Sequence, residues 1–164
     1  MKRWLTLLFV FSVGLAVADM PIVYMPESSL PYEFSASNYD NSTANYDNSL
    51  ANYENSDANY DNSTADFANA PANFDNTVNG DHRLYYGPDN IHMTWAGYYA
   101  VRDKDYINLF SPVGTRMFYK PAGHSGVFSA SDGSFCGVVA EVGGEISLVL
   151  TSHGTRVFHD LNNQ

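Results

Sequence analysis

The sequence predicts an all-β fold class, in which a small β domain follows a disordered arm of seven-residue repeats. Three observations carry this prediction. Residues 81–164 hold short runs of Val, Ile, Phe and Tyr between turn signals, which is typical of β-strands. Part of this region recurs after 40 residues, which indicates an internal duplication. Residues 37–78 repeat every seven residues and are polar and acidic, which favours disorder.

The first 18 residues have the pattern of a cleavable signal peptide. Lys2 and Arg3 precede an apolar stretch over 4–17, which ends in the small-x-small cleavage pattern Ala16-Val17-Ala18. The apolar stretch is shorter than the roughly 20 residues that span a bilayer. We therefore expect a secreted, extracellular protein without a membrane span, whose mature chain begins at Asp19.

The segment that follows is strongly acidic. Residues 19–80 contain ten acidic residues and no Lys or Arg, in a chain of net charge −10. Within this segment, residues 19–36 contain three prolines and are expected to form an extended leader into the repeats. Because a polyanion repels phosphate backbones, nucleic acid is not an expected partner.

Six repeat units occupy residues 37–78, with the pattern Ala-Asn-aromatic-acid-Asn-Ser/Thr. A coiled coil is not expected, because apolar residues two and five apart do not form the three-and-four spacing of its seam. A strand is not expected either, because an odd period places successive aromatic residues on opposite faces. Disorder is the preferred interpretation, and a short solenoid-like stack is the alternative. The units are SNYDNST, ANYDNSL, ANYENSD, ANYDNST, ADFANAP and ANFDNTV.

The repeat tyrosines are candidate residues for aromatic contact or oxidative cross-linking. Aromatic residues at regular intervals in a polar chain can act as separate weak contacts that add up. A solvated spacer is the alternative interpretation. The composition of 37–78 resembles that of secreted, tyrosine-rich repeat proteins of extracellular coats and secretions. The candidates are Tyr39, Tyr46, Tyr53 and Tyr60.

The β domain, residues 81–164, contains two aligned copies of one pattern. Trp95-Ala-Gly-Tyr-Tyr-Ala100 aligns with Phe135-Cys-Gly-Val-Val-Ala140, and Gly114-Thr-Arg-Met-Phe118 aligns with Gly154-Thr-Arg-Val-Phe158. Two three-stranded meanders that cover each other's apolar faces would form a small sandwich or a partly closed barrel. The expected strands are 95–101, 106–111 and 115–120 in the first copy, and 135–141, 146–151 and 155–160 in the second.

No set of residues in this sequence identifies a reaction. Cys136 aligns with Ala96, which favours a small buried residue over a nucleophile or an intermolecular disulfide. The histidines lack zinc-ligand spacing, so we expect no metal, cofactor or catalytic activity. Arg116 and Arg156, from the repeated Gly-Thr-Arg motif, are candidate anion- or carboxylate-binding residues. A structural role, in which each arginine stacks on an aromatic ring or pairs with a nearby acid, is the preferred alternative.

Two further features complete the candidate sites. Asn41 and Asn62 each begin an Asn-Ser-Thr sequon, which is a glycosylation site if the source is eukaryotic. The loop over 120–134 joins the two copies and is a candidate binding loop.

We therefore expect a non-enzymatic extracellular structural or interaction protein, with a β module and a multivalent acidic aromatic arm. Its expected partner is an extracellular protein, a matrix or a second copy of the chain. The alternative is a secreted host-defence or ligand-binding protein, or an enzyme inhibitor, that acts through the β domain.

Overall fold

The computed structural model of the chain describes residues 19–86 and 94–162. The expected signal peptide over 1–18 lies outside the described residues, as does His92. Among the described residues, no helix has both the length and the apolar character needed to cross a membrane.

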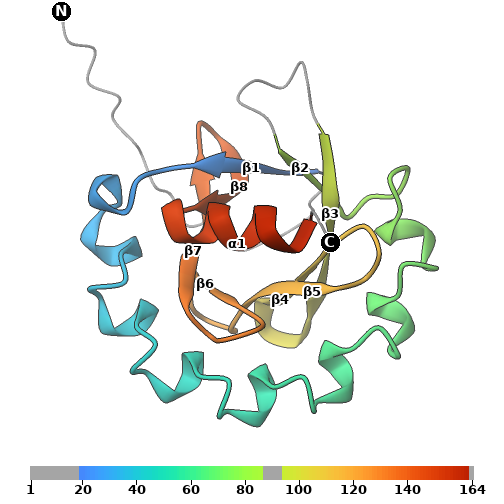
Figure 1. Cartoon of the computed structure of the whole chain (residues 1–164), viewed down its shortest axis with the longest axis horizontal. Helices are drawn as coiled ribbons and strands as arrows, with labels where there is room; N and C mark the ends of the chain where they lie inside the picture. Colours follow the sequence, from blue (N-terminus) through green and yellow to red (C-terminus); the bar gives the residue numbers. More distant parts are fainter. Residues whose placement is uncertain (1–18, 87–93, 163–164) are drawn as a thin grey trace, which may run out of the picture.

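Eight strands close into a barrel in which each strand neighbours the next one in the sequence (Figure 1). Neighbouring strands are antiparallel, except that the first strand pairs in parallel with both the second and the eighth. The prediction of a mostly β fold with a barrel is confirmed, whereas the two-sheet sandwich is not observed, because a single sheet closes on itself. The strands are β1 (Met20–Tyr24), β2 (Arg83–Tyr86), β3 (Thr94–Arg102), β4 (Tyr106–Phe110), β5 (Arg116–Lys120), β6 (Gly126–Ser129), β7 (Phe135–Val142) and β8 (Glu145–Leu150).

Strand β1 comes from the segment expected to be an extended leader. It lies between β2 and β8 and closes the barrel, with Ile22 opposite Tyr86 on one side and Leu148 on the other. The barrel is therefore built from strands on both sides of the repeats, and the expected domain boundary at residue 81 does not separate two units in the fold. Strand β6 lies inside the expected loop over 120–134, so that connection is partly sheet.

The repeats form an ordered belt around the barrel, which differs from the expectation of a disordered arm. We use "belt" for residues 27–76, a series of short 3-10 turns separated by extended residues. The belt passes around the outside of the barrel from β1 to β2 (Figure 1). The turns are η1 (Glu27–Ser29), η2 (Tyr32–Phe34), η3 (Tyr39–Asn41), η4 (Tyr46–Asn48), η5 (Tyr53–Asn55), η6 (Tyr60–Asn62), η7 (Phe67–Asn69) and η8 (Phe74–Asn76).

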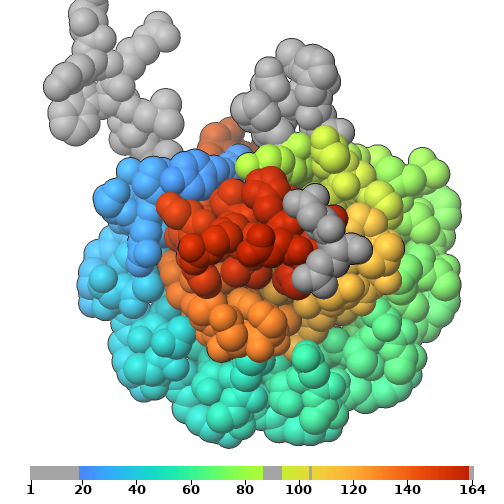
Figure 2. All heavy atoms as spheres, in the orientation of Figure 1, coloured from blue at the N-terminus to red at the C-terminus, as the bar shows by residue number. Residues whose placement is uncertain are grey.

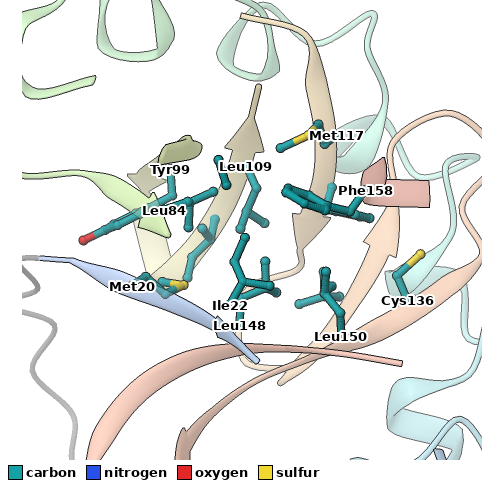
Figure 3. Close-up of a cluster of buried hydrophobic side chains, with 14 residues drawn as sticks. Met20, Ile22, Leu84, Tyr99, Leu109, Met117, Cys136, Leu148, Leu150 and Phe158 are labelled. Atoms are coloured by element: carbon teal, nitrogen blue, oxygen red, sulfur yellow. The ribbon is translucent and has the colours of Figure 1, made fainter. Parts of the chain in front are cut away.

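The barrel interior is filled by apolar side chains. One buried cluster takes members from all eight strands and from the C-terminal helix α1 (Ser152–Asn162), and these side chains converge within the ring of strands (Figure 3). Helix α1 lies across one end of the barrel, where it adds Phe158 to the cluster (Figures 1 and 2). Burial of this cluster is the main apolar contribution to the fold.

The outer wall of the barrel is apolar as well, and the belt covers it. A second buried cluster includes Tyr119, Phe128 and Val149 from the strands, and Phe34 and Leu50 from the belt pack with it. Polar repeats with few apolar residues can therefore be ordered here, because the apolar surface that they cover is supplied by the barrel. Figure 2 shows the belt as the outer rim of the molecule.

The internal duplication holds for two strands of each copy and fails at the third. Gly97 and Gly137 occupy matched places, where an added Cβ would lie about 2.0 and 1.9 Å from a carbonyl oxygen of the neighbouring strand. The first copy continues as the expected strand β5, but residues 155–160 lie in helix α1 instead of a strand. There Gly154 packs against the carbonyl of Cys136, and Val157, Phe158 and Leu161 follow with helical spacing.

Candidate functional site

Each of the six repeat units of the belt, which contain turns η3 to η8, is held by an asparagine or aspartate at the start of its 3-10 turn. In the second unit, Asn45 Oδ1 accepts a hydrogen bond from the backbone N–H of Asp47 at 3.1 Å. This is the usual role of an N-cap residue, whose side-chain oxygen satisfies an N–H that the turn leaves free. The equivalent cap residues are Asn38, Asn45, Asn52, Asn59, Asp66 and Asn73.

A second asparagine ends each turn and links consecutive units. Asn48 Nδ2 donates to the carbonyls of Asp40 at 2.9 Å and Ser42 at 3.0 Å, eight and six residues earlier. The same pair of hydrogen bonds recurs along the belt, so we call these residues the asparagine ladder. All are at most 3% exposed, which means that the belt buries amides and satisfies them with backbone carbonyls. The ladder residues are Asn41, Asn48, Asn55, Asn62, Asn69 and Asn76.

Side chains of the barrel wall then bind the ladder residues one by one. Tyr119 donates its hydroxyl proton to the carbonyl of Asn48 at 2.6 Å, and Tyr98 donates to the carbonyl of Asn69 at 2.8 Å. Between them, Arg116 donates to the carbonyl of Asn55, and Asn108 Nδ2 donates to Asn62 Oδ1 at 3.1 Å. His82 Nδ1 lies 3.2 Å from Asn76 Oδ1. Each of these ladder units therefore has its own polar anchor on the barrel.

The aromatic residues of the repeats point away from the barrel and form an exposed row. Their side chains are 59–67% exposed, nearly the same in every unit. Two hydroxyls bond along the belt, since Tyr60 donates to the carbonyl of Ala65 at 2.8 Å and Tyr46 to that of Ala51 at 3.4 Å. These two rings therefore lie along the belt, over the following unit. The row consists of Tyr39, Tyr46, Tyr53, Tyr60, Phe67 and Phe74.

Arg116, a predicted anion-binding residue, is used within the structure. Its Nε donates to Asn108 Oδ1 at 2.8 Å, and its Nη atoms donate to the carbonyl of Asn55 and to Asp57 Oδ1. Its guanidinium also lies 5.1 Å from the ring centre of Tyr119. The side chain is 7% exposed. Arg116 therefore joins the belt to the barrel wall and has little surface left for an external anion.

Arg156, the other arginine of the motif, lies on helix α1 and is exposed, so the two arginines form no common site. Its Nη2 lies 2.8 Å from Nδ1 of His153. Because a guanidinium can donate hydrogen bonds but cannot accept them, Arg156 is the donor and Nδ1 the acceptor. The proton of His153 then sits on Nε2, 2.7 Å from Ser134 Oγ, and Ser134 donates to Asp132 Oδ1 at 2.7 Å. The hydrogen bonds that the hydroxyl and the backbone N–H of Ser134 donate to Asp132 lower the pKa of this carboxyl. Ser134 is not activated as a nucleophile, because its proton points to Asp132 and His153 has no free acceptor for it.

Cys136 is buried within the barrel, as the alignment with Ala96 predicts. Burial raises the pKa of its thiol to about 12, so the thiol stays protonated and unreactive at neutral pH. Its burial also keeps it away from the surface that an intermolecular disulfide requires. Within the described part of the chain, no group of three or more His, Cys, Asp or Glu residues is arranged to hold a metal ion.

Both sequon asparagines belong to the ladder. Asn41 and Asn62 are 1% exposed, and the side-chain nitrogen that a glycan would occupy donates two hydrogen bonds in each case. A glycan at either position therefore requires the belt unit to open.

A hollow of about 730 Å³ opens between the belt and two connections of the barrel. On the barrel side it is bordered by the turn η9 (Asp103–Asp105), between β3 and β4, and by Pro121, Ala122 and His124 after β5. On the belt side it is bordered by Asn52 and Asn55 and by several carboxylates. The acidic lining residues are Asp47, Glu54, Asp61, Asp66 and Asp103.

Arg102 lines the same hollow and shows how the belt binds a guanidinium. Its Nη2 donates to the carbonyl of Glu54 at 2.8 Å and lies 3.3 Å from Glu54 Oε2. Its Nη1 lies 3.7 Å from Asp61 Oδ2, and its guanidinium carbon lies 3.9 Å from the ring centre of Tyr106. Burial raises the pKa of Tyr106 to about 12, which keeps this ring neutral beneath the arginine.

The structure adds features that the sequence analysis did not identify. The repeat pattern contains the ladder asparagines, but the sequence predicts a role only for Asn41 and Asn62, as sequons. A further unit precedes the six repeats, since Tyr32-Glu33-Phe34-Ser35 stands seven residues before Tyr39-Asp40-Asn41-Ser42, with buried Phe34 in the ladder position. The seven-residue spacing of these tyrosines and serines was the signal that could have found it.

Comparisons of this chain with protein-family models, with curated proteins and with solved structures found no match.

Proposed function

We propose that this protein is a secreted, non-enzymatic structural or interaction protein of the extracellular space, and that its belt makes multivalent contacts with a partner. The observation that carries the proposal is the exposed aromatic row. Six successive units place a Tyr or Phe in the same outward position, although the fold uses none of these rings for its buried core.

The distribution of side chains within each unit supports this proposal. The belt buries its asparagines and exposes its aromatic residues, which reverses the usual preference of soluble proteins. Single exposed apolar residues are common, but a regular series of large rings is a feature of binding surfaces. An acidic residue directly follows the ring in five of the six units, and Asp66 directly precedes Phe67 in the other unit, so the row offers both apolar and charged contacts.

Multivalency explains why the same contact is repeated. One exposed ring contributes a weak interaction, but rings held on one frame add up through their effective concentration. The proposed partner is an extracellular protein, a matrix or a second copy of this chain.

The alternative, in which the β domain alone binds a ligand, has less support. Side chains from all eight strands fill the barrel interior, and the belt covers apolar surface on the outer wall. A catalytic role has little support as well, because neither Cys136 nor Ser134 is held in a reactive state.

The test replaces Tyr39, Tyr46, Tyr53 and Tyr60 together by Ser. We expect this variant to lose self-association in sedimentation velocity or co-sedimentation with insoluble extracellular matrix, while its circular dichroism spectrum is unchanged. A matched control replaces four exposed alanines by Ser, each five residues after one of these tyrosines, and should retain both properties. Retention of both properties by the tyrosine variant would contradict the proposal. The control positions are Ala44, Ala51, Ala58 and Ala65.

A further inference from the structure

The hollow beside the belt is strongly negative. Five carboxylates line it, and Arg102 is the one Lys or Arg residue among the described lining residues. Such a surface attracts cations over the distance of a Debye length and repels anions. The charge of the hollow therefore favours a cationic occupant.

Arg102 identifies the kind of cation that a belt unit binds. Its guanidinium donates to both the backbone carbonyl and the carboxylate of the same residue, Glu54, and lies over the ring of Tyr106. A planar guanidinium with several donors suits this set of acceptors better than the compact ammonium of lysine does. Its contact with an aromatic face adds a cation–π attraction.

Asp47 offers the same two acceptors one unit earlier in the belt. Its carbonyl accepts one hydrogen bond, from Asn55 Nδ2 at 2.7 Å, and a carbonyl oxygen can accept two. The carbonyl of Glu54 does accept two hydrogen bonds. One comes from Asn62 Nδ2 at 2.9 Å and the other from Arg102. No salt bridge among the described residues involves the Asp47 carboxylate. The Asp47 unit thus lacks the arginine that the Glu54 unit has.

A buried acceptor in the lining is also unpaired. Asn55 is fully buried and lines the hollow, and its Oδ1, like that of Asn48 in the preceding unit, has no hydrogen-bond partner among the described residues. The equivalent oxygens of Asn62 and Asn76 face donors on the barrel, which are Asn108 and His82. A buried unpaired acceptor costs free energy, and this oxygen keeps its capacity to accept from a donor.

We propose that this hollow is a docking site for an arginine-rich segment of a partner protein, with Asp47 as the first guanidinium subsite. This inference rests on the proposed function, since it gives the chemical class of the belt's partner. The incoming guanidinium donates hydrogen bonds to the carbonyl and the carboxylate of Asp47, in the same way that Arg102 donates to those of Glu54. The carboxylate of Asp103, on the opposite border of the hollow, attracts the rest of the segment.

The test measures binding of a fluorescent arginine octapeptide to the mature full chain by fluorescence anisotropy. We expect Asp47→Asn to weaken binding about tenfold, because it removes a charge-assisted acceptor. Asp103→Asn should also weaken binding. Asp75→Asn is the matched control, because it removes the same charge from an equivalent unit outside the lining of the hollow. It should change the dissociation constant less than about twofold. A lysine octapeptide should bind more weakly than the arginine peptide.

Three outcomes would overturn the inference: no binding of the arginine peptide, equal weakening by Asp47→Asn and Asp75→Asn, or equal affinity for the lysine peptide. The last two would reduce the interaction to general attraction by a polyanion. The side chain of Asp47 makes no hydrogen bond or salt bridge among the described residues, so the variant should fold, and circular dichroism checks this.

Failure of the peptide-binding experiment can be distinguished from failure of the proposed function. If the peptide does not bind but the tyrosine variant still loses assembly or matrix retention, the partner class is wrong and the function stands. If the peptide binds at Asp47 but the tyrosine variant keeps assembly and retention, the multivalent role of the aromatic row is wrong.

Discussion

Substitution of Asn62 by Ala tests whether the asparagine ladder holds the belt together. The Asn62 side chain donates to the carbonyls of Glu54 at 2.9 Å and Ser56 at 2.8 Å, and accepts from Asn108 at 3.1 Å. A typical hydrogen bond contributes about 1 kcal/mol net, so three bonds amount to about 3 kcal/mol. The Glu54 carbonyl is not left unpaired after the substitution, because it keeps its hydrogen bond from Arg102. The expected loss of unfolding free energy is therefore about 2–3 kcal/mol.

The assay is urea unfolding followed by circular dichroism. With a slope of about 1–3 kcal/mol per molar urea for a small protein, a loss of about 2–3 kcal/mol should lower the midpoint by about 0.7–3 M. Asn79→Ala is the matched control, because Asn79 is exposed and has no hydrogen bond from its side chain among the described residues. Its effect should stay within about 0.5 kcal/mol. If Asn62→Ala shifts the midpoint no more than this control does, the ladder does not stabilise the fold and the reasoning is refuted.

Three other perturbations test the barrel and its contact with the belt. Tyr119→Phe removes a hydroxyl that donates to a ladder carbonyl at 2.6 Å, and should lower the unfolding free energy by about 1 kcal/mol in the same urea assay; an unchanged midpoint would argue against this anchor. Gly97→Ala places a Cβ about 2.0 Å from a carbonyl oxygen of β4, and should cost more than about 2 kcal/mol, whereas wild-type stability would show that the strands do not approach as described. Burial raises the pKa of Tyr106 to about 12, above the value of about 10 in the unfolded chain, so its contribution to stability is complete below pH 10 and is lost as the pH rises toward 12. A phenolate absorbance titration should show this tyrosine ionising only above the unfolded-chain value, and ionisation near pH 10 in the folded protein would contradict its burial.

Five of the six described barrel strands from residue 94 onward were predictable because they follow local rules, whereas β6 lies in a segment expected to be a loop. Alternating apolar residues and turn signals place β3, β4, β5, β7 and β8 close to where the structure has them. Strand β1 was not predictable in this way, because Pro21 and its short length favour an extended leader and its partners are distant in the sequence. Helix α1 was missed because the alignment of Gly154 with Gly114 suggested a turn and a strand. The two glycines have different roles, since Gly114 adopts a φ of 88° and Gly154 permits close packing in a helix.

The ordered structure of the belt could not be predicted from the sequence for a different reason. The composition of 37–78 predicts disorder because the segment has little apolar surface of its own. The asparagine ladder acts together with stabilisation from outside the segment, namely the apolar outer wall and anchors such as Tyr98, Arg116 and Tyr119. A composition rule considers a segment alone and does not include a surface that another part of the chain supplies. The buried asparagines gave a periodic signal, but asparagine is usually exposed, so its periodicity did not suggest a core.

Hydrogen exchange of the belt, followed by mass spectrometry on the intact mature chain, tests the central claim most directly. Each unit contains the backbone hydrogen bonds of a 3-10 turn, which join residues three apart. Examples are Asn48 N–H to the Asn45 carbonyl and Asn55 N–H to the Asn52 carbonyl. If the repeats form a belt anchored to the barrel, peptides from 37–80 should exchange far more slowly than an unfolded chain. Destabilisation by Asn62→Ala should speed this exchange. Exchange of 37–80 at the rate of an unfolded chain, with the barrel still protected, would show that the repeats are a disordered arm and would contradict this account.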